Sequence, residues 1–265
     1  MLNQPTFILV HGAFANSFSF APLQAELALL GHRSVAVDLP GHGFEATFPA
    51  SYQAPQDLAA LAGEPGGIEG VTLADNAARV IDVLERAKRN GPTVLVAHSR
   101  GGITATAVAN ARPDLVDRIV YVSAWCPVDL EVGGYYAEPE MADVDAGALT
   151  ADPTALAALK RAFAADLTDD EFRTFLSTFQ PDENLDAGTS ADRAQATTWG
   201  RIPRTYVRLA ADASVPPAVQ DRMIREADAL TPNNPFDVRT LEGSHLRWLV
   251  RPIPAAELLA DLAGF

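Results

Sequence analysis

The stretch TVLVAHSRGG at residues 93–102 decides the fold class of this chain. A β-branched and aliphatic run ends abruptly at Ser99, small residues stand two positions before and after it (Ala97 and Gly101), and a helix-like pattern runs from 103 to 111. This layout is typical of a strand, a tight turn and a helix with the serine at the apex, where bulky neighbours would collide. Because such a turn strains its central residue, we interpret Ser99 as a functional residue whose hydroxyl lies beside a helix N-terminus.

The motif by itself leaves a second interpretation of Ser99 open, in which the serine only caps the helix that begins near Gly101. Serine is a preferred N-cap residue, so the local pattern does not separate a nucleophile from a cap. Ala97 stands where the Gly-x-Ser-x-Gly pattern has its first glycine, but alanine is small enough for the turn. Whether Ser99 is a nucleophile or a helix cap therefore depends on catalytic partner residues elsewhere in the chain.

Composition narrows the class of protein. The chain has 265 residues, 48% of them hydrophobic, which suits one α/β domain with an insertion and a sizeable core. A net charge of -14, from 34 acidic and 20 basic residues, disfavours nucleic acid and membrane surfaces as partners. No transmembrane run or signal peptide is visible, so we expect a cytoplasmic protein. The single cysteine, Cys126, excludes an intrachain disulfide, and we expect neither a metal nor another cofactor.

Apolar runs bounded by turn residues alternate with helical patterns along the chain, which predicts a mostly parallel sheet with helices on both faces. The expected strands span residues 7–10, 34–37, 93–96, 119–122, 204–209 and 236–241. The expected helices, besides the one after Ser99, span residues 22–30, 73–90, 154–164, 169–179, 218–229 and 255–262, and Thr72 with Asp75 fits a capping box for the second of these.

Two stretches interrupt the alternation. Residues 44–71 are rich in proline, glycine and alanine, and we expect a loop or short helices there. Residues 127–202 show no strand pattern, and an insertion at the carboxyl end of a strand is well placed to cover a site at that end. We therefore expect an α/β core formed by residues 1–127 and 203–265, with residues 128–202 as a helical cap or lid.

A serine hydroxyl needs a base to become a strong nucleophile, and the usual base is a histidine oriented by a carboxylate. Of the five histidines, His245 follows the last expected strand, which places it at the same end of a parallel sheet as Ser99. His98 is adjacent to Ser99 and would point in a different direction. Asp212 follows the preceding strand and is the preferred acid, and Asp129 is the alternative. The order Ser, Asp, His is that of α/β-hydrolases.

Acyl chemistry also needs donors for the oxyanion that forms on the carbonyl. One donor would be the backbone N–H of Arg100, directly after the serine, and we assign the other to the N–H of Ala13 in the loop HGAF. We expect Phe14, His98 and Trp125 to line the substrate site, with plain packing as the alternative for Trp125. The Arg100 side chain would either steer an anionic substrate group or form a surface ion pair.

These pieces together resemble the α/β-hydrolase superfamily over residues 6–265. The matching motifs are VHGA at 10–13, DLPGHG at 38–43, AHSRGG at 97–102, Asp212 with Pro216, Pro217 and Gln220, and GSH at 243–245. The resemblance is greatest to the branch that contains plant methylesterases and hydroxynitrile lyases. It implies that Ser99, Asp212 and His245 form a catalytic triad, that the amides of Ala13 and Arg100 form an oxyanion hole, and that a cap precedes the strand bearing the acid.

Two departures from the sequence patterns of related enzymes restrict the reaction that we expect. Hydroxynitrile lyases have a lysine directly after the catalytic histidine, and this chain has Leu246. Related epoxide hydrolases and dehalogenases use an aspartate nucleophile, and here that position is Ser99. Cyanohydrin cleavage, epoxide opening and dehalogenation are therefore disfavoured.

Our leading hypothesis is a cofactor-free serine hydrolase that cleaves a small-molecule carboxylic ester or lactone through an acyl-enzyme. A second hypothesis keeps the triad as an acid/base pair in a lyase, cyclase or other tailoring enzyme. A third is a small-molecule receptor that has lost turnover, which an intact set of serine, histidine and aspartate argues against. The expected partner is a small-molecule substrate, and a homodimer is left open.

Overall fold

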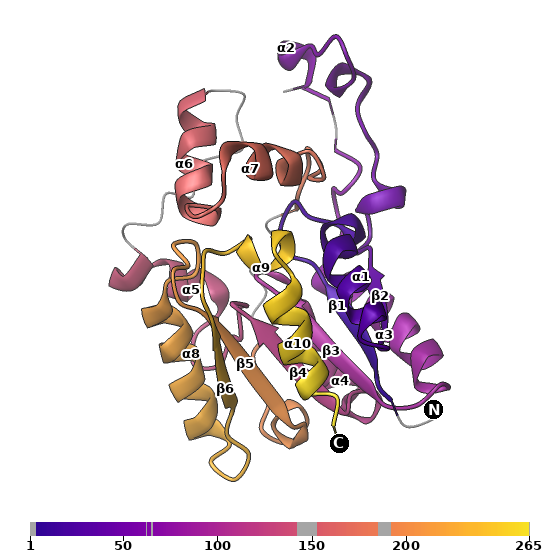
Figure 1. The fold of residues 1–265 in the computed structure, drawn as a ribbon, viewed down its shortest axis with the longest axis vertical. Coiled ribbons are helices and arrows are strands. Elements are labelled where there is room, and N and C mark those ends of the chain that lie inside the picture. Colours follow the sequence, from indigo (N-terminus) through magenta and orange to yellow (C-terminus); the bar gives the residue numbers. More distant parts are fainter. Residues whose placement is uncertain (1–3, 62, 65, 142–152, 185–191, 265) are drawn as a thin grey trace.

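The computed structural model describes residues 4–61, 63–64, 66–141, 153–184 and 192–264 (Figure 1). Its centre is a six-stranded sheet with the order β2-β1-β3-β4-β5-β6, in which every neighbouring pair is parallel. The strands are β1 (Thr6–Val10), β2 (Arg33–Val37), β3 (Thr93–His98), β4 (Arg118–Val122), β5 (Arg204–Leu209) and β6 (Asp237–Leu241). The six expected strands are thus confirmed, with end shifts of one or two residues.

Burial explains why the central strands read as continuous apolar runs. Every residue of β1 and β3 is buried, because helices cover both faces of a parallel sheet. In the outer strand β2, exposed residues alternate with less exposed ones, and the outer strand β6 is largely exposed. The sequences of both strands are correspondingly more polar. Phe236 lies just outside β6, where its buried ring packs edge-on against Tyr206.

Helices form two layers around the sheet (Figure 1). One face is covered by α3 (Leu73–Lys88), α4 (Gly101–Ala111) and α8 (Pro217–Leu230). The other is covered by α1 (Ala21–Leu29), α9 (Arg247–Val250) and α10 (Ile253–Asp261). The predicted capping box is confirmed, since Thr72 and Asp75 exchange side-chain and backbone hydrogen bonds at the start of α3.

The stretch predicted as a loop or short helices contains only 3-10 turns and the one-turn helix α2 (Leu58–Leu61) in its described part. Between β4 and β5 the chain forms α5 (Val132–Tyr136), α6 (Pro153–Phe163) and α7 (Asp169–Leu176). Helices α6 and α7 lie over the end of the sheet opposite the chain termini (Figure 1). The division into a core and a cap at residues 128 and 202 stays a prediction.

Two backbone hydrogen bonds place this covering segment at the carboxyl ends of the strands. The N–H of Leu246 donates to the Phe163 carbonyl at 2.9 Å, and the N–H of Gln180 donates to the Phe14 carbonyl at 3.0 Å. Among the described helices, none combines the length and apolar character needed to span a bilayer.

Candidate active site

Ser99 occupies a strained turn between β3 and α4. Its φ is +52°, in the left-handed region that residues other than glycine rarely adopt. The Ser99 carbonyl accepts hydrogen bonds from the amides of Gly102 and Trp125, at 3.1 and 3.0 Å, which hold this conformation. A Cβ atom at Gly101 would lie 2.5 Å from the His11 carbonyl oxygen, and one at Gly102 would overlap the Trp125 carbonyl oxygen. The small residues after the serine are therefore required for the turn to pack onto the sheet.

His245 and Asp212 form a buried pair past the ends of β6 and β5. Nδ1 of His245 lies 2.5 Å from Oδ2 of Asp212, and both residues are at most 3% exposed. The other carboxylate oxygen, Oδ1, accepts the amides of Ser214 and Val215 at 2.7 and 2.9 Å. Asp129, the alternative acid, is exposed. The carboxylate that contacts the histidine is thus Asp212.

Ser123 is a member of this cluster that the sequence analysis missed. It follows β4 directly, has a φ of +40°, and donates from Oγ to Oδ2 of Asp212 at 2.5 Å. Oδ2 therefore receives both the Ser123 hydroxyl and the ring of His245. The signal available in the sequence was position, because Ser123 follows a buried strand at the same sheet end as Ser99.

His98, the residue before Ser99, packs against His245. The rings of His98 and His245 lie 4.4 Å apart, and Nε2 of His98 donates to the His245 carbonyl at 3.2 Å. Burial, followed by the proximity of His245, lowers the pKa of His98 well below its usual value, so His98 is neutral. Within the described residues the Ser99 hydroxyl forms no hydrogen bond. Catalytic hydrogen bonds are commonly long in the absence of substrate.

The loop after β1 lies directly against the serine. A Cβ atom at Gly12 would fall 2.8 Å from Cβ of Ser99, so only glycine allows this approach. His11 anchors the loop, since Nδ1 donates to the Gly12 carbonyl at 2.8 Å and Nε2 accepts the Leu39 amide at 3.3 Å. Burial lowers the pKa of His11 to about 4, which keeps its ring neutral as these bonds require. The interpretation of His11 as structural agrees with these contacts.

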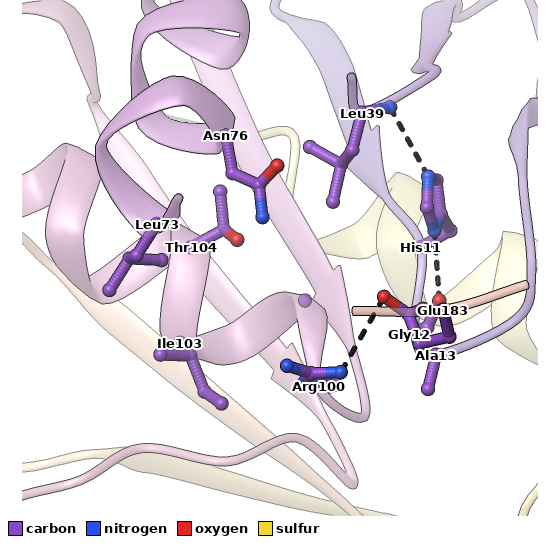
Figure 2. Close-up of a pocket in the computed structure, with 11 residues that line it drawn as sticks. His11, Gly12, Ala13, Leu39, Leu73, Asn76, Arg100, Ile103, Thr104 and Glu183 are labelled. Carbon is purple, nitrogen blue, oxygen red and sulfur yellow. Dashed lines mark hydrogen bonds and ion pairs between the residues drawn. The ribbon is translucent and has the colours of Figure 1, made fainter. Parts of the chain in front are cut away.

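A second residue missed by the sequence analysis is Glu183, which contacts the backbone amide of Phe14, next to Ala13, and the side chain of Arg100. Its Oε2 accepts the Phe14 amide at 2.8 Å and lies 3.3 Å from Nε2 of His42, and its Oε1 lies 3.5 Å from Nη1 of Arg100. Figure 2 shows Glu183 and Arg100 pointing toward each other, joined by a dashed line, among the residues that line a pocket. Of the two roles left open for the Arg100 side chain, the structure shows an ion pair, which is mostly buried and not at the surface.

The three residues expected to line the substrate site have different surroundings. Phe14 is half-buried with a φ of +58°, on the loop beside Ser99. His98 is enclosed between His245 and Trp248. Trp125 is 2% exposed and packs against Tyr135 and Tyr136, as the packing alternative describes. Substrate contact stays a prediction for all three.

The model of the alpha/beta hydrolase family matches residues 7–258. The chain therefore belongs to the alpha/beta hydrolase family, and it is an enzyme of that type. This agrees with the parallel sheet, the strained serine turn and the strand-end positions of Asp212 and His245.

Named relatives are hydrolases and esterases. The chain is 26% identical to a pyrethroid hydrolase of Sphingobium wenxiniae, over 97% of this chain and 86% of that protein. It is 26% identical to methylesterase 9 of Arabidopsis thaliana, over 83% of this chain and 85% of that protein. The resemblance to the branch with plant methylesterases is thus confirmed, and ester hydrolysis is supported as the general reaction.

Solved structures share the fold over nearly the whole length. A polyneuridine aldehyde esterase superposes with a TM-score of 0.72 at 19% identity, covering 98% of this chain and 99% of that one. A pyrethroid hydrolase superposes with a TM-score of 0.73 at 23% identity, covering 98% of both chains. The α/β-hydrolase fold expected from the sequence is confirmed.

Proposed function

We propose that this protein is a cofactor-free serine hydrolase that cleaves a small carboxylic ester or lactone through a Ser99–His245–Asp212 triad. The observation that carries the proposal is the buried contact between Nδ1 of His245 and Oδ2 of Asp212. A carboxylate on Nδ1 leaves Nε2 as the basic nitrogen, which is the form a general base needs. The strained Ser99 turn at the end of β3 supplies the nucleophile.

The proposed reaction proceeds in two acyl-transfer steps. Ser99 Oγ attacks the substrate carbonyl while Nε2 of His245 takes the hydroxyl proton, and Asp212 stabilises the resulting imidazolium. The tetrahedral intermediate collapses, and the leaving alcohol takes the proton from His245. Water, deprotonated by His245, then attacks the acyl-enzyme, and Ser99 recovers its proton as the acid leaves. In a lactone the leaving alcohol stays attached to the product.

The oxyanion would be held by the amides of Ala13 and Arg100. In support, no hydrogen bond within the described part of the chain uses the Ala13 amide, so it is available to a ligand. The close approach of Gly12 to Ser99 sets this loop beside the nucleophile. Donors of this kind each contribute about 3 kcal/mol of transition-state stabilisation.

The test is hydrolysis of a panel of p-nitrophenyl esters and lactones by the wild type, Ser99→Ala and the exposed-site control Ser177→Ala. We expect Ser99→Ala to lose at least about 10³-fold in kcat and all labelling by a fluorophosphonate probe, with Ser177→Ala unchanged. Full turnover by Ser99→Ala would refute the proposal. Products formed in ¹⁸O-water without incorporated ¹⁸O would instead point to lyase or cyclase chemistry.

A further inference from the structure

A segment that follows α7, residues 178–184, is tied to the loop that bears the proposed oxyanion donor. The Thr178 carbonyl accepts the side-chain amide of Asn16 at 2.9 Å. Further along, the side chain of Gln180 accepts the Gly43 amide and donates to the Gly41 carbonyl, both at 3.1 Å. The 178–184 segment therefore closes over two loops at the carboxyl edge of the sheet.

Phe14 forms two of the hydrogen bonds between this loop and the 178–184 segment. Both of its backbone polar groups are used by the segment, because its N–H donates to Glu183 at 2.8 Å and its carbonyl accepts the Gln180 amide at 3.0 Å. Its φ of +58° is strained for a residue other than glycine, and such strain persists only when surrounding contacts hold it. Phe14 is bonded directly to Ala13, so holding Phe14 in place restrains the backbone of Ala13, and through it the neighbouring Gly12–Ala13 peptide that carries the Ala13 N–H.

Glu183 also contacts the side chain of Arg100, the residue whose backbone amide is the other proposed oxyanion donor. The side chains of Glu183 and Arg100 are 8% and 17% exposed, and Oε1 of Glu183 lies 3.5 Å from Nη1 of Arg100. Figure 2 marks this ion pair with a dashed line. Burial alone would raise the pKa of Glu183, but the His42 ring, Arg100 and the Phe14 amide outweigh it, so the pKa lies below its usual value. One ionised carboxylate thus bridges the residue after Ala13 and the residue whose amide is the other donor.

We propose that Glu183 is a positioning residue that orients the oxyanion hole, by holding the Phe14 amide and the Arg100 side chain at the same carboxylate. The inference rests on the proposed function. A negative charge this close would oppose an oxyanion, and the positive charge of Arg100 balances it. Glu183 acts through the backbone of its neighbours, and its removal should affect the transition state more than substrate binding.

The alternative is that Glu183 only fastens the covering segment to the core, and the chain offers a matched control. Glu171, at the start of α7, makes a two-point contact with Arg251 at 2.9 Å for both oxygens. Glu171→Ala therefore removes another carboxylate contact between the same covering segment and the core. Glu171 itself does not contact the oxyanion loop within the described residues.

The experiment compares Glu183→Ala, Glu183→Gln, Glu171→Ala and Ser99→Ala, with p-nitrophenyl butyrate as substrate and butylboronic acid as a tetrahedral-adduct inhibitor. We expect Glu183→Ala to lose about 10- to 100-fold in kcat with KM within about two-fold, and its boronate Ki to rise in parallel. Glu183→Gln should lose less, at least about three-fold, because its amide oxygen still accepts the Phe14 N–H but lacks the charge that pairs with Arg100. Glu171→Ala should keep wild-type kcat even if its melting temperature falls.

The outcomes separate the two proposals. If Ser99→Ala is inactive and Glu183→Ala keeps its kcat and boronate affinity, or loses no more than Glu171→Ala, the positioning role is refuted and the triad stands. If Ser99→Ala retains full turnover, the proposed function fails and the inference fails with it. Should Glu183→Ala not fold, Glu183→Gln decides, and wild-type kcat and boronate Ki in that variant would overturn the inference.

Discussion

Ser123 and Asp212, 89 residues apart in the chain, are joined by a hydrogen bond of 2.5 Å from the serine hydroxyl to Oδ2, the oxygen that also contacts His245. Both residues are buried, and Ser123 has a positive φ that directs its side chain from the end of β4 toward the loop after β5. With the amides of Ser214 and Val215 on Oδ1, the carboxylate has donors on both oxygens. Asp212 is therefore held in one orientation before any substrate binds.

We predict that Ser123→Ala lowers kcat about ten-fold and leaves KM nearly unchanged, because a charge-assisted hydrogen bond to the orienting carboxylate is lost. Steady-state kinetics on the best ester of the panel measures this. Ser214→Ala is the matched control, since its contact with Asp212 is made by the backbone amide and survives the substitution. Equal kcat values for Ser123→Ala and the wild type would contradict the prediction.

The assignment of the acid is tested by Asp212→Asn and Asp129→Asn. An amide cannot stabilise the imidazolium and favours the wrong tautomer of His245, so we expect kcat of Asp212→Asn to fall about 10³- to 10⁴-fold. Asp129 is exposed and its carboxylate has no role in the proposed site, so Asp129→Asn should keep wild-type activity. The reverse pattern would exchange the roles of the two aspartates.

Gly12→Ala should lower turnover about 10²-fold while preserving the fold. The new Cβ would lie 2.8 Å from Cβ and 3.3 Å from Oγ of Ser99, so the loop and the nucleophile must move apart. A misplacement of about 1 Å in a near-attack geometry is enough to lower turnover about 10²-fold. Gly133→Ala is the control, because nothing lies within 4 Å of its added Cβ. Rates of fluorophosphonate labelling provide the measurement, and unchanged labelling of Gly12→Ala would count against the close approach.

The buried histidines predict a loss of stability in mild acid. Burial lowers the pKa of His11 to about 4 and that of His98 well below its usual value, whereas both titrate near 6.5 in the unfolded chain. The unfolded state therefore binds more protons below pH ~6.5, and the free energy of unfolding should fall as the pH drops from about 6.5 to about 4.

Urea unfolding across this pH range measures the effect, with His11→Gln as the comparison. Glutamine can accept the Leu39 amide as His11 does but does not titrate, so the variant should lose less stability between pH 6.5 and 4. An identical pH dependence in the variant and the wild type would show that His11 does not contribute.

Local patterns in the sequence were sufficient for the architecture. Buried strands in a parallel sheet have apolar sequences. The glycines that follow Ser99 in HSRGG are typical of a tight turn between a strand and a helix, because only small residues pack there. The strand-end rule then predicted that Ser99, Asp212 and His245 share one edge of the sheet, since all parallel strands end there. These inferences depend on residues close together in the chain and on one rule of topology.

Only the tertiary structure decided which side chains meet at that edge. The order β3-β4-β5-β6 sets Ser123 between the serine turn and Asp212. The competing Asp129 is exposed. Glu183 reaches Phe14 and Arg100 from a segment that carries no strand pattern, across 169 residues in the first case. Such contacts depend on how far each loop extends past its strand and on how the covering segment folds back. The periodicity of the sequence encodes neither the reach of a loop nor the path of the covering segment, so only the packed chain determines these contacts.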